Sequence, residues 1–131
     1  GYLVINGGTV VASANPASDA GLDSDMGSFV NGGTVIALGS TMDWAESDSN
    51  QVTMNLQFAQ YQSSGSAIVV TKEDGAVIFA YDPSEDEVLG ENMRQYMGAV
   101  ISCPAFTRGE TYQLWRHRHG NRRRVCFRRR L

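Results

Sequence analysis

The sequence predicts an all-β protein: the last rungs of a right-handed parallel β-helix, a small antiparallel β cap and a disordered basic tail. Two observations predict the helix and its cap. The phrase VINGGTVVA at 4–12 returns as FVNGGTVIA at 29–37, 25 residues later, and such spaced β-rich repeats are typical of solenoids. Short alternating strands follow from residue 51. No apolar run approaches the roughly 18 residues of a membrane helix, so no membrane span is expected.

The repeat predicts how the rungs stack. Equivalent residues of neighbouring rungs lie about 4.8 Å apart, which places Ile5 over Val30 in the interior. At the bend, Asn6 over Asn31 is expected to form a structural ladder of side-chain amides, and the glycines adopt backbone angles closed to other residues. Because Asn-Gly is also a strong hairpin signal, two similar hairpins in an antiparallel sheet stay open as the alternative.

Residues 51–115 are expected to cap the two rungs of residues 1–50. Residues 51–58 alternate apolar and polar positions like a half-buried strand, and residues 66–81 form a hairpin with a turn at Glu73-Asp74-Gly75. Ser84 and Glu87 match a capping box, which predicts a short helical insertion near 84–92. Two more strands are expected at 98–104 and 110–115. Together these strands would protect unpaired backbone groups at the end of the rungs.

The repeat also predicts an acidic cluster. At the same offset, LDSD at 22–25 falls on SDSN at 47–50, so Asp23 would lie about one strand spacing from Asp48, with Asp25 nearby. Calcium, which accepts carboxylate and carbonyl oxygens flexibly, would relieve the repulsion between these groups. We therefore expect Asp23, Asp25 and Asp48 as metal ligands. The alternative is that these aspartates only favour turns.

Charge is divided unevenly along the chain. Residues 1–115 contain all 14 acidic residues and only three basic ones, whereas the segment RHRHGNRRRVCFRRRL at 116–131 holds the other eight. Clustered arginines favour nucleic-acid binding, but a one-base shift of reading frame would also turn CGG arginine codons into glycine codons. A solvated tail without function is the third interpretation. Since the body has so little basic charge, we do not expect nucleic acid as the partner.

A family resemblance follows from INGGTVVA, GLDSD, VNGGTVIA and AIVVTKEDGAVIFAYDPS, with AVISCPAFTRGETYQLW at the end. These phrases resemble the C-terminal part of a bacterial carbohydrate-binding domain family, whose members are cell-surface parallel β-helix proteins. The resemblance covers residues 1–115. It implies polysaccharide partners such as polygalacturonate or cellulose, an extracellular location, and calcium bound by Asp23 and Asp25. It also implies that the chain is a fragment with further rungs upstream.

Non-catalytic carbohydrate binding is therefore the expected function. A β-helix lyase needs a basic residue beside its metal, and the body offers only Lys72, Arg94 and Arg108, all outside the repeat. For sugar contact we expect Trp44, flanked by Asp43 in a polar loop, and Tyr96. Calcium would bridge the acidic body to acidic glycans. The alternative is a structural or adhesin-type stalk in which calcium serves stability alone.

Overall fold

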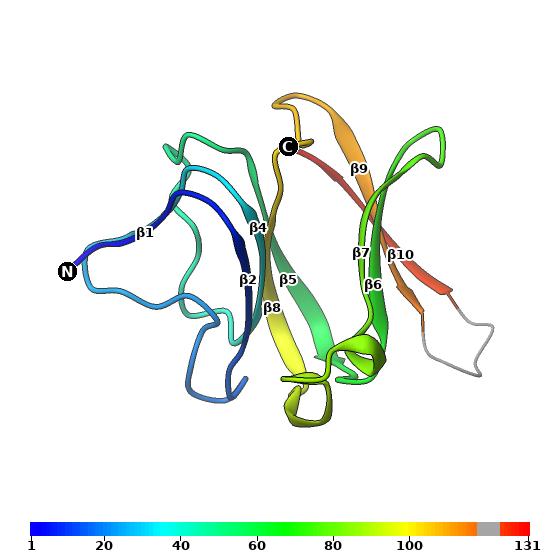
Figure 1. Cartoon of the computed structure of the whole chain (residues 1–131), viewed down its shortest axis with the longest axis horizontal. Helices are drawn as coiled ribbons and strands as arrows, with labels where there is room; N and C mark the ends of the chain where they lie inside the picture. Colours follow the sequence, from blue (N-terminus) through cyan, green and yellow to red (C-terminus); the bar gives the residue numbers. More distant parts are fainter. Residues whose placement is uncertain (118–123) are drawn as a thin grey trace. The chain divides into compact units, whose positions relative to one another are not determined.

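The computed structural model describes residues 1–117 and 124–131, and its regular structure is all-β (Figure 1). Its strands are β1 Leu3–Ile5, β2 Thr9–Ser13, β3 Ser28–Val30, β4 Thr34–Gly39, β5 Thr53–Gln62, β6 Ala67–Lys72, β7 Val77–Tyr81, β8 Tyr96–Ser102, β9 Thr111–His117 and β10 Arg124–Arg130. Two 3₁₀ turns, η1 Pro83–Glu85 and η2 Gly90–Asn92, lie between β7 and β8. None of the described helical segments is long and apolar enough to span a membrane.

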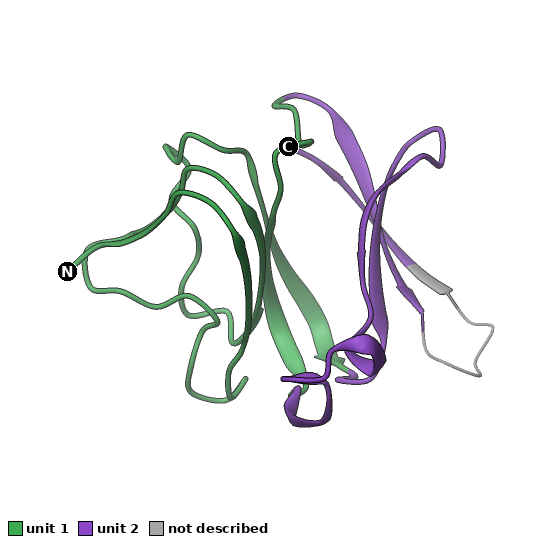
Figure 2. Ribbon diagram, viewed as in Figure 1, with its two compact units in different colours: residues 1–62, 94–108 green, residues 63–93, 109–131 purple. Residues whose placement is uncertain are grey.

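The chain forms two units (Figure 2). Residues 1–62 and 94–108 make unit 1, which holds β1–β5 and β8, while residues 63–93 and 109–131 make unit 2. This division differs from the expected one. The strands β5 and β8, expected in the cap, belong with the rungs, whereas β6, β7 and β9 form a separate sheet with part of the basic segment.

The 25-residue repeat sets the strand register in unit 1. β1 pairs with β3 and β2 with β4, both in parallel, and the partners include Ile5 with Val30 and Val11 with Ile36. A parallel β-helix, however, is not shown. The far edge of β4 pairs with β8 in antiparallel fashion, and β8 pairs with β5, so the order β2-β4-β8-β5 is a mixed sheet. The expected role of antiparallel strands in covering the rung edge is met by β8.

The interior of unit 1 is filled by stacked aliphatic residues. Ile5 and Val30 form one stacked pair and Val35 and Ala37 lie further along, all within one buried cluster. Strand β5 alternates as expected, because Met54, Leu56 and Phe58 are buried between more exposed neighbours. Burial of apolar area, at roughly 25 cal/mol per Å², is the main force that holds such rungs together.

The amide ladder is present at the bend. Asn31 Nδ2 donates to Asn6 Oδ1 at 3.3 Å, and Asn31 Oδ1 accepts from the backbone N–H of Asn50 at 3.1 Å. The segment after β4 thus adds a partial third layer, in which the Gln51 N–H donates to the Val30 carbonyl at 3.0 Å and the Ser49 hydroxyl accepts from the Val30 N–H at 3.0 Å. This layer runs at an offset of 19 from the second, as Asn31 and Asn50 show.

The ladder gives a testable difference between its two asparagines. Asn31→Ala removes a side-chain donor and a side-chain acceptor, whereas Asn6→Ala removes one acceptor. Since a typical net hydrogen bond contributes about 0.5–1.5 kcal/mol, we expect a loss of about 1–2 kcal/mol in unfolding free energy for Asn31→Ala. For Asn6→Ala we expect at most about half of that loss. Urea denaturation followed by circular dichroism measures both, and equal losses would contradict the ladder.

Unit 2 is a four-stranded sheet in the order β10-β9-β6-β7, with antiparallel pairs throughout. The β6–β7 hairpin turns at Gly75, whose φ of 89° lies in the left-handed region that glycine adopts readily. The expected hairpin at 66–81 therefore has the expected turn. One sheet face buries Ile68, Val70, Tyr112 and Leu114.

The helical insertion near 84–92 differs in detail from the expected capping box. Two short 3₁₀ turns replace an α-helical turn, and Asp82 caps the first, because its carboxylate accepts from the Ser84 N–H at 2.9 Å. Gly90 begins η2 instead of closing a helix. Asp86 accepts from the Tyr81 hydroxyl at 2.7 Å, which together with burial and the negative charge of Asp86 raises the pKa of Tyr81.

The basic segment is ordered where the structure describes it, so the expected disorder is wrong for residues 116, 117 and 124–131. Residues 118–123 lie outside the described residues. Strand β10 pairs with all of β9, which satisfies its backbone groups. Phe127 lies opposite the buried Leu114, and the Arg128 guanidinium forms an ion pair with Glu73 in the β6–β7 turn. Apolar packing and charge neutralisation thus order a strand whose composition alone suggested solvation.

Candidate functional site

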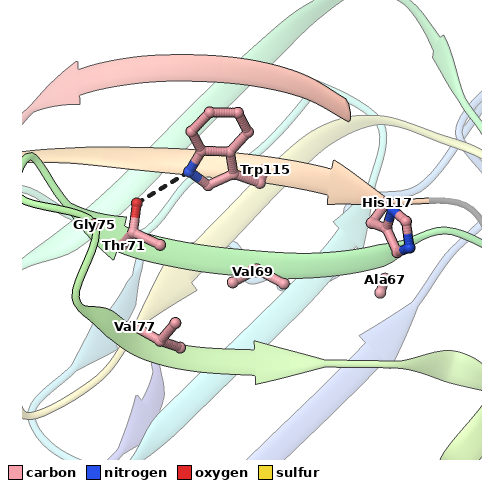
Figure 3. Close-up of a pocket in the computed structure, with 7 residues that line it drawn as sticks. All are labelled: Ala67, Val69, Thr71, Gly75, Val77, Trp115 and His117. Atoms are coloured by element: carbon pink, nitrogen blue, oxygen red, sulfur yellow. Dashed lines mark hydrogen bonds between the residues drawn. The ribbon is translucent and has the colours of Figure 1, made fainter. Parts of the chain in front are cut away.

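An open groove lies on one face of the unit 2 sheet (Figure 3). It has a volume of about 400 Å³, within the usual size range of small-ligand sites. Its lining comes from alternate residues of neighbouring strands and from the β6–β7 hairpin: Ala67, Val69, Thr71, Gly75, Val77, Trp115 and His117. Because successive strand residues point to opposite faces, these side chains share the face that Ile68, Val70 and Leu114 do not.

The strand register arranges this face in cross-strand rows. One row holds Trp115 between Val69 on β6 and Cys126 on β10. The next row holds Gln113 between Thr71 and Arg128. Directly opposed residues on one face have Cβ atoms about 4.5–5.5 Å apart, and diagonal neighbours are within reach of long side chains. A ligand over Trp115 would therefore meet an apolar row and a polar row side by side.

Hydrogen bonds hold the indole of Trp115 in place. Its Nε1–H donates to the Thr71 hydroxyl oxygen at 3.0 Å, and that hydroxyl donates to Gln113 Oε1 at 3.4 Å. Trp115 is half-buried, so part of its ring is accessible in the groove, and Val77 beside it is 63% exposed. A fixed and partly accessible aromatic ring is suited to stacking against a flat apolar surface.

His117 forms one end of the groove, beside Ala67 (Figure 3). Its Nδ1 atom is covered and has no hydrogen-bond partner within residues 1–117 and 124–131. Cys126, opposite Trp115, is a free thiol, as is the buried Cys103 of unit 1, and partial burial raises the pKa of both thiols. Among the residues that line the groove, His117 is the single titratable group.

The three expected metal ligands are not brought together. Asp23, Asp25 and Asp48 are all exposed, and Asp25 lies 3.9 Å from the amino terminus of Gly1. Within the described part of the chain, no group of three or more acidic, His or Cys side chains is arranged to hold a metal ion. The expected stacking of Asp23 over Asp48 is wrong because the third layer runs at an offset of 19: the Ser24 N–H donates to Asp43 instead.

The expected sugar-binding residues of unit 1 have structural surroundings. Asp43 accepts from the backbone N–H groups of Ser24 and Trp44, at 3.1 and 2.9 Å. Trp44 is half-buried and packs against the unit 1 core, so its loop is less exposed than its polar neighbours suggested. Tyr96 is 2% exposed and packs edge-to-face against Phe58. Tyr96 therefore offers no face to a ligand, which corrects that expectation.

Sequence reasoning missed the groove, although one signal was available. In TYQLWRH at 111–117 the polar and aromatic residues Gln113, Trp115 and His117 alternate with Tyr112 and Leu114. That alternation predicts one buried and one ligand-accessible face for the strand. Which strands would flank Trp115 did not follow from the local pattern.

Comparison of the chain with protein-family models, with curated proteins and with solved structures found no match.

Proposed function

We propose that this protein binds polysaccharide without catalysing a reaction, through the groove around Trp115. The observation that carries the proposal is the held indole: a half-buried ring, tied to Thr71 at 3.0 Å, in an open groove of about 400 Å³. Pyranose rings present apolar C–H faces and hydroxyl edges, which match an indole next to a polar row. The binding is non-catalytic in this proposal because His117 is the one titratable group of the lining.

Charge favours acidic glycans as ligands. Arg128 is a diagonal neighbour of Trp115 on the same face, since it lies opposite Gln113 in the register. It is two-thirds exposed and shares its charge with Glu73. A uronate carboxylate placed over the groove would find an arginine partner directly, and arginine binds carboxylates with favourable geometry. Calcium is therefore an optional component of this proposal and no longer the bridge to the ligand.

The proposal includes a wider setting for unit 1. Its two stacked turns, in register at 25 residues, are consistent with rungs of a right-handed parallel β-helix in a polysaccharide-binding protein of the bacterial cell surface. The competing function, a structural stalk, is favoured by the same stacking but gives no role to the groove. Glycan binding separates the two.

The test is isothermal titration of the full chain with an oligogalacturonate and with a cello-oligosaccharide, in calcium and again in EDTA. We expect binding in both buffers, stronger for the oligogalacturonate, and a loss of at least about tenfold for Trp115→Ala. Removing the indole takes away an apolar contact of several tens of Å², worth about 1.5–2 kcal/mol or roughly 10- to 30-fold in affinity.

Trp44→Phe serves as the matched control, because Trp44 packs against the unit 1 core. Equal affinity of wild type and Trp115→Ala would overturn the groove as the site. Binding that vanishes in EDTA and with Asp23→Ala would instead favour the calcium bridge, and absence of binding to either glycan would favour the stalk.

A further inference from the structure

The polar row beside the groove contains a hydrogen-bond chain with a fixed direction. An indole Nε1–H is a donor only, so in the 3.0 Å contact the Thr71 oxygen must accept from Trp115. The Thr71 hydroxyl hydrogen then remains to be donated. Its partner at 3.4 Å is Gln113, recorded through the amide oxygen Oε1.

This direction orients the Gln113 amide. Because Oε1 faces Thr71, the Nε2 amide group with its two N–H donors points away from Thr71, on the face shared with Trp115 and Arg128. Gln113 is half-buried, so its side chain is accessible at that face. The opposite amide orientation would set N–H donors of Gln113 against a hydroxyl hydrogen, which the chain of donors excludes.

We propose that Gln113 is a specificity-determining residue that donates a hydrogen bond from Nε2 to an acceptor oxygen of a glycan stacked on Trp115. This inference rests on the proposed function and names a residue outside the lining of the groove. The acceptor is a sugar hydroxyl or ring oxygen in a neutral glycan and a carboxylate oxygen in a uronate. Arg128, opposite Gln113 on β10, makes the position electrostatically favourable for the carboxylate.

The experiment uses three variants of the full chain and the same two oligosaccharides. Gln113→Glu keeps an oxygen for Thr71 but replaces the donor by a charged acceptor, and Gln113→Ala removes the side chain. Thr71→Val keeps the shape of Thr71 and breaks both bonds that orient the amide. Gln57→Glu, at an exposed glutamine of β5, repeats the charge change away from the groove.

We expect Gln113→Ala to weaken binding of both oligosaccharides about 3- to 10-fold, as for one hydrogen bond. Gln113→Glu should weaken oligogalacturonate by more than tenfold, and more than the neutral glycan, because the new carboxylate repels the uronate. Thr71→Val should weaken both about threefold or more, and Gln57→Glu should change neither by more than about twofold.

The outcomes separate this inference from the function on which it rests. If Trp115→Ala abolishes binding while both Gln113 variants bind like wild type, the role of Gln113 is overturned and the groove remains the site. If Gln113→Glu and Gln57→Glu weaken uronate binding equally, the effect is one of net charge and the inference also falls. If wild type binds neither oligosaccharide, the proposed function and the inference fail together. Circular dichroism of each variant establishes that the sheet is intact.

Discussion

Gly32→Ala is expected to lower the free energy of unfolding by about 2–4 kcal/mol, whereas Gly7→Ala, at the equivalent position of the first rung, changes it by less than about 1 kcal/mol. A Cβ atom on Gly32 would press against the Asn6 carbonyl oxygen, closer than real Cβ contacts allow. A Cβ atom on Gly7 would meet nothing within 4 Å. Neither residue has a positive φ, so packing alone separates the two substitutions.

The cost of Gly32→Ala arises between the rungs. To admit the methyl group, the second bend must move away from the first, which strains the bonds from the Asn31 N–H to the Ile5 carbonyl at 2.7 Å and from the Thr34 N–H to the Gly8 carbonyl at 2.9 Å. Overpacking of a tight contact typically costs 1–3 kcal/mol and more where backbone must shift. Gly→Ala in open space, by contrast, slightly stabilises through the unfolded chain.

Urea denaturation of wild type and the two variants measures this difference. Gly33→Ala and Gly8→Ala extend the series, since both residues have φ near 80° and both substitutions are strained. Only the one at Gly33 also meets backbone, at 2.6 Å from the Gly8 carbonyl oxygen. If Gly7→Ala and Gly32→Ala destabilise equally, the two bends do not stack.

What the sequence could predict follows from how local each feature is. The register of Ile5 with Val30 was predictable because the repeat writes the same strand, bend and strand twice. The continuation of that offset to Asp48 was not, because the first turn contains an extra loop at 15–18. Ala14 and Asp19 both bond to the end of β4 and the residues between them bulge outward, so the next turn needs fewer residues.

The candidate site depended on non-local pairing. Thr71 and Trp115 meet because β6 pairs with β9, over forty residues later, and no local pattern names that partner. Polar neighbours in the sequence also misled: Asp43 next to Trp44 suggested an exposed sugar contact, but its carboxylate bonds backbone N–H groups. The arginine-rich segment was misread for a similar reason, since its pairing with β9 supplies what its composition lacks.

Tyr96→Ala is expected to be the most destabilising of the proposed substitutions, at about 3–5 kcal/mol. Tyr96 begins β8, is 2% exposed, and its ring lies 5.6 Å from that of Phe58 at an interplanar angle of 76°. Truncating a large buried aromatic residue leaves a cavity and costs about this much. The edge-to-face pair adds about 0.5–1.5 kcal/mol. Domains of this size have a total stability of about 5–15 kcal/mol, so the variant should unfold well below the wild-type urea midpoint.

Tyr96→Phe separates the ring from the hydroxyl group. It keeps the packing against Phe58, so we expect it to retain most of the stability that Tyr96→Ala loses. Both variants, titrated with oligogalacturonate at low temperature where they are folded, should bind within about twofold of wild type, because Tyr96 lies in unit 1 and presents no accessible face. A Tyr96→Ala protein of near-normal stability with weakened glycan binding would instead return Tyr96 to the ligand site and place Phe58 outside the core.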